Sequence, residues 1–188
     1  MARIKYGISD AYYAAVTSES LGVLTYDTPK ALKGAVSITL TPSSEQVTEY
    51  ADNGVWFQQM TNFGYTGSLE LETIPDDFRE DVLLESADTK DVLWEADNVT
   101  PKEFALFFKF EIGGDSTSTG KKVCLLRCTA ARPDMAGSTK TNTITPEHET
   151  INITAVPRLS DHLVKATCES SSAAYATWTN AVPTVSTN

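Results

Sequence analysis

The side chains best suited to metal binding or acid–base chemistry are few and scattered in this sequence. His148 lies between Glu147 and Glu149, and His162 follows Asp161. A metal site needs three or four converging ligands at a characteristic spacing, and the chain contains no HxH, HExxH or CxxC pattern. We therefore expect both histidines to lie at solvated strand edges, and we expect no metal site.

Nucleophilic and carboxylate chemistry is equally weakly supported. No GxSxG elbow presents a serine, and Gly113-Gly114 is not part of a GxxxxGK[ST] phosphate loop. The pairs Asp76-Asp77 and Glu80-Asp81 fall in a short candidate helix, where a solvated acidic face is the simpler interpretation. We expect no catalytic residue and no cofactor, while a small β-fold hydrolase that uses such acidic pairs is kept as an alternative.

The three cysteines, Cys124, Cys128 and Cys168, favour free thiols in a reducing compartment, because their number is odd. Cys124 and Cys128 are four residues apart on a candidate strand, so we expect both to point to the same face. At the usual rise they lie about 13 Å apart, too far to share a zinc ion. With Leu126 between them, they are predicted to be small buried core residues.

Composition argues against a broad nucleic-acid surface. Fifteen Lys and Arg against twenty-five Asp and Glu give a net charge of −10, which repels a phosphate backbone. The densest basic stretch, Lys121-Lys122 with Arg127 beyond it, is better explained as a solvated strand end. No apolar run approaches the roughly 18 residues that would span a bilayer, so we expect a soluble protein with no membrane partner.

Alternation of apolar and polar residues is the main structural signal, and it predicts strands with one buried and one solvated face. In one run, Leu69 and Leu71 lie on the buried face of a strand and Glu70 lies on its solvated face. In the longest run, every second residue of 104–112 is apolar and lies on the same face. About eight strands are predicted in all. They cover 36–41, 46–50, 55–60, 68–72, 104–112, 122–130, 150–155 and 162–168.

Evidence for helices is limited to residues 75–86. Pro75 suits a first helical turn, Asp76 and Asp77 complement the positive end of the helix dipole, and Phe78 and Val82 would face a sheet. One short helix among many strands predicts a mainly β protein. We expect a two-sheet β-sandwich or barrel-like fold with one short flanking α-helix.

We divide the chain into three segments. Residues 34–169 form the predicted β-sandwich core, and 170–188 form a C-terminal tail rich in Ser, Thr and Ala. Residues 1–33 match neither a strand nor a long helix, and we interpret them as an extended arm that contacts neighbouring subunits and that the core does not need for folding. The candidate interface side chains in this arm are aromatic: Tyr6, Tyr12, Tyr13 and Tyr26.

Several short motifs occur in a characteristic order over the first third of the chain. They are Lys5-Tyr-Gly-Ile-Ser-Asp-Ala-Tyr-Tyr-Ala, the run from Leu24-Thr-Tyr through Gly34-Ala-Val-Ser, and Tyr50-Ala-Asp-Asn-Gly. In order and spacing they resemble the opening of siphophage major tail proteins, the tail tube proteins of long-tailed bacteriophages. Gly67-Ser-Leu-Glu-Leu and the strand at 104–112 are similar in order but less specific.

The resemblance implies a structural virion protein. It implies the two-sheet β tail tube fold and six subunits per ring, with rings stacked into a hollow tail tube in the virion after assembly in the host cytoplasm. The implied partners are other copies of the chain, a tape-measure protein in the lumen, and tail terminator and baseplate or tail-tip proteins at the tube ends. The resemblance also implies that DNA passes through the tube during ejection without specific binding. The acidic side chains that we expect to face the lumen are Glu70 and Glu72.

Two other functions stay open. A monomeric ligand- or carbohydrate-binding β-sandwich would use Trp56, Trp94 and Trp178 as stacking residues. Another virion structural role, as a tail terminator or a head-decoration protein, is closer to the tail tube hypothesis. Size-exclusion chromatography separates a monomeric binding module from a polymerising subunit.

Overall fold

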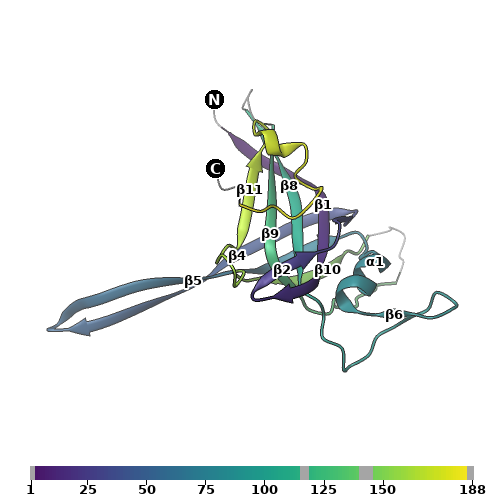
Figure 1. The fold of residues 1–188 in the computed structure, drawn as a ribbon, viewed down its shortest axis with the longest axis horizontal. Coiled ribbons are helices and arrows are strands. Elements are labelled where there is room, and N and C mark those ends of the chain that lie inside the picture. The colour runs from purple at the N-terminus through teal and green to yellow at the C-terminus, as the bar shows by residue number, and fades with distance from the viewer. Residues whose placement is uncertain (1–2, 115–118, 140–145, 186–188) are drawn as a thin grey trace.

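A computed structural model describes residues 3–114, 119–139 and 146–185 of the chain. As the alternation predicts, the protein is mainly β, with one large antiparallel sheet and one short helix (Figure 1). Within the described residues, no helix has the length and apolar character needed to cross a membrane.

Nine strands form the large sheet, and two short strands form a separate ribbon. The order across the sheet is β2-β1-β8-β9-β10-β5-β4, with β3 paired to β1 and β11 paired to β9. The strands of the large sheet are β1 (Ile4–Ser20), β2 (Val23–Tyr26), β3 (Lys30–Ala31), β4 (Ala35–Ala51), β5 (Gly54–Leu71), β8 (Phe104–Gly113), β9 (Gly120–Ala130), β10 (Glu149–Ala155) and β11 (Lys165–Glu169). The separate ribbon pairs β6 (Ser86–Ala87) with β7 (Leu93–Trp94).

The sheet divides at β9, which pairs with different strands along its two halves. Residues 121–125 pair with β11, whereas residues 128–130 pair with β10. One layer therefore contains β1, β8, β9 and β11, and the other contains β10, β5 and β4. This gives the two-layer, sandwich-like arrangement predicted from the sequence.

The main core lies between these layers and beneath the helix. The helical segment begins with α1 (Asp76–Phe78) and continues as a π-helical turn, η1 (Arg79–Leu83), so the prediction of a helix over 75–86 is confirmed in a shorter form. Phe78 and Val82 are fully buried, as predicted. The Phe78 ring makes edge-to-face contacts with Tyr13 at 5.0 Å and Phe104 at 5.4 Å between centroids.

A second, smaller core lies on the other face of β1, β8 and β9. Ala14, Phe107 and Leu126 are buried there, and side chains from the C-terminal tail cover them. Trp178 is one of these covering residues, so it anchors the tail. The tail also contains a short 3-10 helix, η2 (Ala173–Tyr175). Both faces of β8 are consequently buried.

The N-terminal segment is not a free arm, so this prediction is wrong. Residues 4–20 form a central strand that pairs with β8 over most of its length, and β2 and β3 also belong to the sheet. Tyr13 is 1% exposed in the main core. The division at residue 33 therefore falls within one continuous fold rather than between an arm and a core.

The cysteine prediction is confirmed for burial but wrong for orientation. Cys124, Cys128 and Cys168 are free and buried. Cys124 packs in the smaller core, whereas Cys128 packs in the main core. The cause is a β-bulge: Phe104 pairs with Cys128 and Leu106 with Leu125, which leaves one extra residue on β9 and reverses the alternation.

Candidate assembly surface

The most prominent feature of the surface is the long hairpin of β4 and β5, which projects well beyond the two layers (Figure 1). Only the root of the hairpin is supported by another strand, since β10 pairs with β5 between Tyr65 and Leu71. Beyond that point, residues 44–51 pair only with residues 54–62. At the usual strand rise this two-stranded part is about 26 Å long.

Large apolar side chains cover the distal part of the hairpin and are exposed to solvent. Trp56 is 74% exposed, Tyr50 73% and Met60 67%. The others are Val47, Val55, Phe57 and Phe63. A two-stranded ribbon is marginally stable by itself in water, and a contiguous apolar surface is typical of a protein–protein contact. The distal hairpin therefore has the composition of a surface that a partner covers.

The two faces of the distal hairpin differ in charge. Paired residues share a face, so Glu45, Val47 and Glu49 lie on the same side as Phe57, the partner of Glu49. The opposite face carries Met60 with its partner Gln46 and has no charged side chain over residues 44–50 and 56–62. We call the first face the acidic face of the hairpin. Neither of its carboxylates forms an ion pair within the described chain.

The geometry of the hairpin is fixed at its tip and at its root. Asp52 and Asn53 at the tip both have positive φ, 49° and 62°, as a two-residue turn between twisted strands requires. At the root, Gly64 has a φ of 115°, and a Cβ there would lie 2.0 Å from the carbonyl oxygen of Ala155. The glycine allows the hairpin to leave the sheet beside β10.

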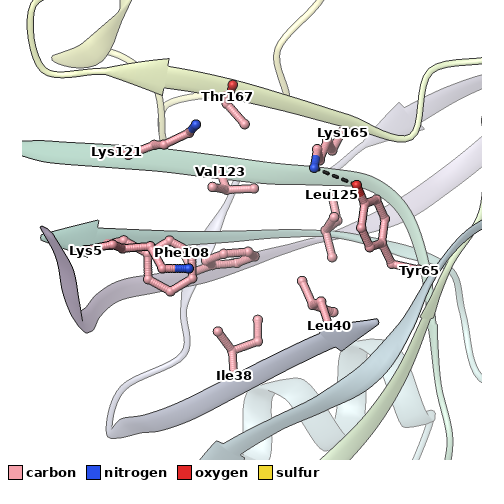
Figure 2. Close-up of a pocket in the computed structure, with 11 residues that line it drawn as sticks. Lys5, Ile38, Leu40, Tyr65, Phe108, Lys121, Val123, Leu125, Lys165 and Thr167 are labelled. Carbon is pink, nitrogen blue, oxygen red and sulfur yellow. Dashed lines mark hydrogen bonds between the residues drawn. The ribbon is translucent and has the colours of Figure 1, made fainter. Parts of the chain in front are cut away.

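A pocket of about 380 Å³ opens between the two layers, close to the root of the hairpin. Its floor is apolar and includes Ile38 and Leu40 from β4, which point toward Val123 and Leu125 from β9 (Figure 2). Phe108, Phe110 and Tyr65 complete the apolar lining. The two strands beside the opening, β4 and β11, each have one edge with no strand partner among the described residues.

Three lysines surround this pocket: Lys5, Lys121 and Lys165 (Figure 2). The Lys165 ammonium donates a 2.6 Å hydrogen bond to the hydroxyl of Tyr65 and lies over its ring. The Lys5 ammonium lies 4.1 Å from the centroid of the Phe110 ring. None of the three forms an ion pair with a carboxylate in the part of the chain that the structure describes. We call this the lysine-rimmed pocket.

A second polar cluster, beneath the helix, has a structural role. Asp81 accepts hydrogen bonds from the Tyr13 hydroxyl at 2.7 Å and from the Lys30 ammonium at 2.6 Å. Burial alone would raise the pKa of Asp81, but the bonds from Lys30 and Tyr13 outweigh it and lower that pKa. Burial, together with the Asp81 carboxylate, raises the pKa of Tyr13 well above its usual value. The cluster ties β1 and β3 to the helical segment.

The four predicted interface tyrosines lie in different environments. Tyr13 is buried, so its assignment to a subunit interface is wrong. Tyr12 and Tyr26 pack against the smaller core, and the Tyr26 hydroxyl donates to the carbonyl of Leu126. Tyr6 is 58% exposed and stays a predicted interface residue.

The acidic side chains predicted to face a lumen lie near the hairpin root. Leu69 and Leu71 are fully buried, and Glu70 lies on the opposite face, where it accepts a hydrogen bond from Ser37. Glu72 follows the end of β5 and is exposed, with a carboxylate oxygen 3.6 Å from Nδ1 of His148. Their position in an assembled tube stays a prediction.

The residues considered for ligand and metal chemistry do not converge. Trp56 lies near the hairpin tip, Trp94 on the β6–β7 ribbon and Trp178 against the smaller core, and none lines the lysine-rimmed pocket. Among the described residues, no group of three His, Cys, Asp or Glu could hold a metal ion.

Sequence reasoning missed both the length of the hairpin and the pocket. The hairpin was predicted as separate strands, although the absence of Lys and Arg from residues 34–78 already indicated a segment of unusual charge. The pocket had no sequence signal, because six strands supply its lining. The sequence matches no protein-family model, and it matches no curated protein.

Proposed function

We propose that this protein is a structural virion subunit that polymerises with copies of itself, as stacked hexameric rings, into the tail tube of a long-tailed bacteriophage. The tube would lie in the virion tail after assembly in the host cytoplasm and would enclose a tape-measure protein. Tail terminator and baseplate or tail-tip proteins would close its ends. No catalytic residue or cofactor takes part in this role.

The observation that carries the proposal is the projecting hairpin. Its distal part has exposed aromatic and aliphatic side chains on both faces and two strand edges that no other strand of the described chain covers. An isolated monomer would leave this surface in water and leave its edges open to uncontrolled pairing. Contact with neighbouring copies would cover both the apolar side chains and the strand edges. The hairpin therefore supports a polymerising role over that of a monomeric binding module.

The resemblance of the N-terminal motifs to siphophage tail tube proteins supports a tail tube as the polymer. Tyr50-Ala-Asp-Asn-Gly, one of those motifs, forms the tip of the hairpin. The other motifs supply β1 and the first part of β4. The segments that carry the resemblance therefore include the tip of the hairpin and the start of its first strand.

A shortened hairpin tests the proposal. Residues 44–63 contain no buried side chain, so replacing them with Asn-Gly between Ser43 and Gly64 should leave both cores intact. We expect the full-length protein to form hollow tubes visible by negative-stain electron microscopy. The shortened variant should stay a folded monomer by size-exclusion chromatography and circular dichroism.

Three outcomes would contradict the proposal or the role given to the hairpin. Full-length protein that stays monomeric at all concentrations would favour the binding-module alternative. Tubes of normal appearance from the shortened variant would mean that another surface drives assembly. Closed hexameric rings that never stack would instead favour a tail terminator.

A further inference from the structure

The acidic face of the hairpin and the lysine-rimmed pocket are complementary in charge and in polarity. The acidic face presents Glu45 and Glu49 beside Val47 and Phe57, whose side chains are 44% and 48% exposed. The pocket presents three lysine ammonium groups around an apolar floor. Within the described chain, the carboxylates of the acidic face have no cationic partner, and the lysines of the pocket have no carboxylate partner. Each surface supplies the charge that the other needs.

The hairpin cannot fill the pocket of its own chain. The pocket lies near the root of the hairpin, and the tip projects away from the two layers (Figure 1). The acidic face lies on the distal, two-stranded part, which extends about 26 Å beyond that root. An occupant with this chemistry must therefore come from a second copy.

Charge favours a second copy over an arbitrary partner. The chain carries a net charge of −10, yet the pocket has three lysines without a carboxylate partner within the described chain. Residues 34–78 contain no Lys or Arg, so the hairpin brings no cation that these lysines would repel. Two carboxylates on one strand, about 13 Å apart, can meet lysines on different sides of the opening.

We propose that the acidic face of the hairpin of one copy docks into the lysine-rimmed pocket of the next copy. Phe57 and Val47 cover the apolar floor, while Glu45 and Glu49 pair with the lysines. The contact is heterologous, because the hairpin of one copy uses the pocket of the next, and a head-to-tail series of such contacts builds rings or filaments. This inference rests on the proposed function, to which it adds a specific pair of surfaces.

A charge swap tests the docking. The tip variant Glu45→Lys/Glu49→Lys and the pocket variant Lys121→Glu/Lys165→Glu should each weaken self-association at least tenfold in sedimentation velocity, since each places like charges together. The variant with all four substitutions should recover to within about threefold of the wild type, because it restores opposite charges with their positions exchanged.

Matched controls separate docking from net charge. Lys33→Glu/Lys90→Glu changes the net charge as the pocket variant does, at exposed lysines outside the pocket, and should leave association unchanged. Asp91→Lys/Asp97→Lys is the corresponding control for the tip. The docking would be overturned if the variant with all four substitutions associates as weakly as either double variant. It would also be overturned if the pocket variant associates like the wild type.

Cross-linking gives a second readout that does not depend on tube formation. Protein with Val47→Cys is mixed with protein with Thr167→Cys, a residue of the pocket lining, under mild oxidation. A disulfide-linked dimer should form, whereas mixing with Thr129→Cys, an exposed residue outside the pocket lining, should give none. The native thiols add little background, because all three are buried, and burial raises the pKa of Cys124 and Cys128.

The outcomes distinguish this inference from the proposed function. Normal tubes without the specific cross-link would overturn the docking and leave the tail tube proposal intact. The specific cross-link in short oligomers that never become tubes would support the docking and contradict the tail tube proposal. If instead the pocket variant loses binding of a fluorescent fatty acid but keeps wild-type self-association, the docking is wrong and the pocket is a site for small anionic amphiphiles.

Discussion

Tyr13 connects the first strand to the helical segment through one hydrogen bond and one aromatic contact. Its hydroxyl donates to Asp81, and its ring packs edge-to-face on Phe78. Because burial and the Asp81 carboxylate raise its pKa above the usual 10.0, the folded protein keeps this proton at a pH where the unfolded chain has lost it. This residue should therefore make the fold sensitive to alkali.

We predict that the free energy of unfolding falls as the pH rises above about 10, and that the fall is shallower in Tyr13→Phe. The unfolded state binds fewer protons than the folded state in that range, so the free energy of unfolding decreases as the pH rises. One tyrosine contributes at most about 1.4 kcal/mol per pH unit to this slope. Urea unfolding at pH 9, 10 and 11 measures the two slopes.

Near neutral pH the same substitution should cost about 1.5–3 kcal/mol, the usual contribution of a hydrogen bond to a charged group. Tyr12→Phe is a matched control, because no side-chain hydrogen bond to a carboxylate involves Tyr12 in the described structure. Identical alkaline slopes for wild type and Tyr13→Phe would show that Tyr13 is not the group that titrates.

Single residues also show where alternation fails as a guide. The burial of Leu69 and Leu71, with Glu70 outside, was predictable because β5 is regular there. The opposite placement of Cys124 and Cys128 was not, because one extra residue in β9 reverses the faces beyond it. A bulge of this kind depends on pairing with β8 and has no signature in β9 alone.

Among the elements, β1 departs furthest from the sequence-based expectation. Both of its faces are buried near its centre, with Tyr13 in the main core and Ala14 in the smaller one. Its register with β8 also shifts twice, and Asp10 has a positive φ of 51° at one shift. A strand that is buried on both sides and interrupted by bulges shows no period of two, so the sequence pattern alone does not identify it as a strand.

Deleting residues 1–30 should therefore unfold the protein instead of releasing a folded core. The deletion removes β1, leaves the edge of β8 that pairs with β1 unpaired, and breaks the contact between Tyr13 and Phe78. We expect circular dichroism of the truncated chain to show no cooperative thermal transition. A cooperative transition like that of the full-length protein would restore the interpretation of this segment as an arm.

The regular strands and the helix position were predictable from local patterns. Alternation identified parts of β4, β5, β8, β9 and β10, and Pro75 with its two aspartates marked the start of the helical segment. Patterning did not reveal that 36–41 continues into 46–50 as a single strand. Pro42 interrupts the pattern, and it is tolerated there because β4 is an edge strand.

For the whole molecule, the charge of −10 per subunit has a consequence for DNA. Acidic side chains that face the lumen, such as the predicted Glu70 and Glu72, would repel the phosphate backbone and let the duplex slide. We predict no saturable binding of linear duplex DNA to assembled tubes in a gel-shift titration at low salt. Micromolar binding that weakens steeply with added salt would indicate a basic DNA-contacting surface.

Assembly was expected from the N-terminal motifs, but the assembly surfaces were not. The lysine-rimmed pocket is built from residues between Lys5 and Thr167, so only the tertiary fold brings them together. The acidic face of the hairpin depends on cross-strand register, which local alternation does not fix beyond the root. Both surfaces therefore became visible only with the three-dimensional arrangement.

The proposed function requires the chain to polymerise into a hollow tube of six-membered rings. Electron cryo-microscopy of the purified full-length protein, with averaging of end-on views, tests it most directly. We expect hollow rings with six-fold symmetry that stack into unbranched tubes. A monodisperse particle of about 20.4 kDa at every concentration, or filaments without a lumen, would contradict it.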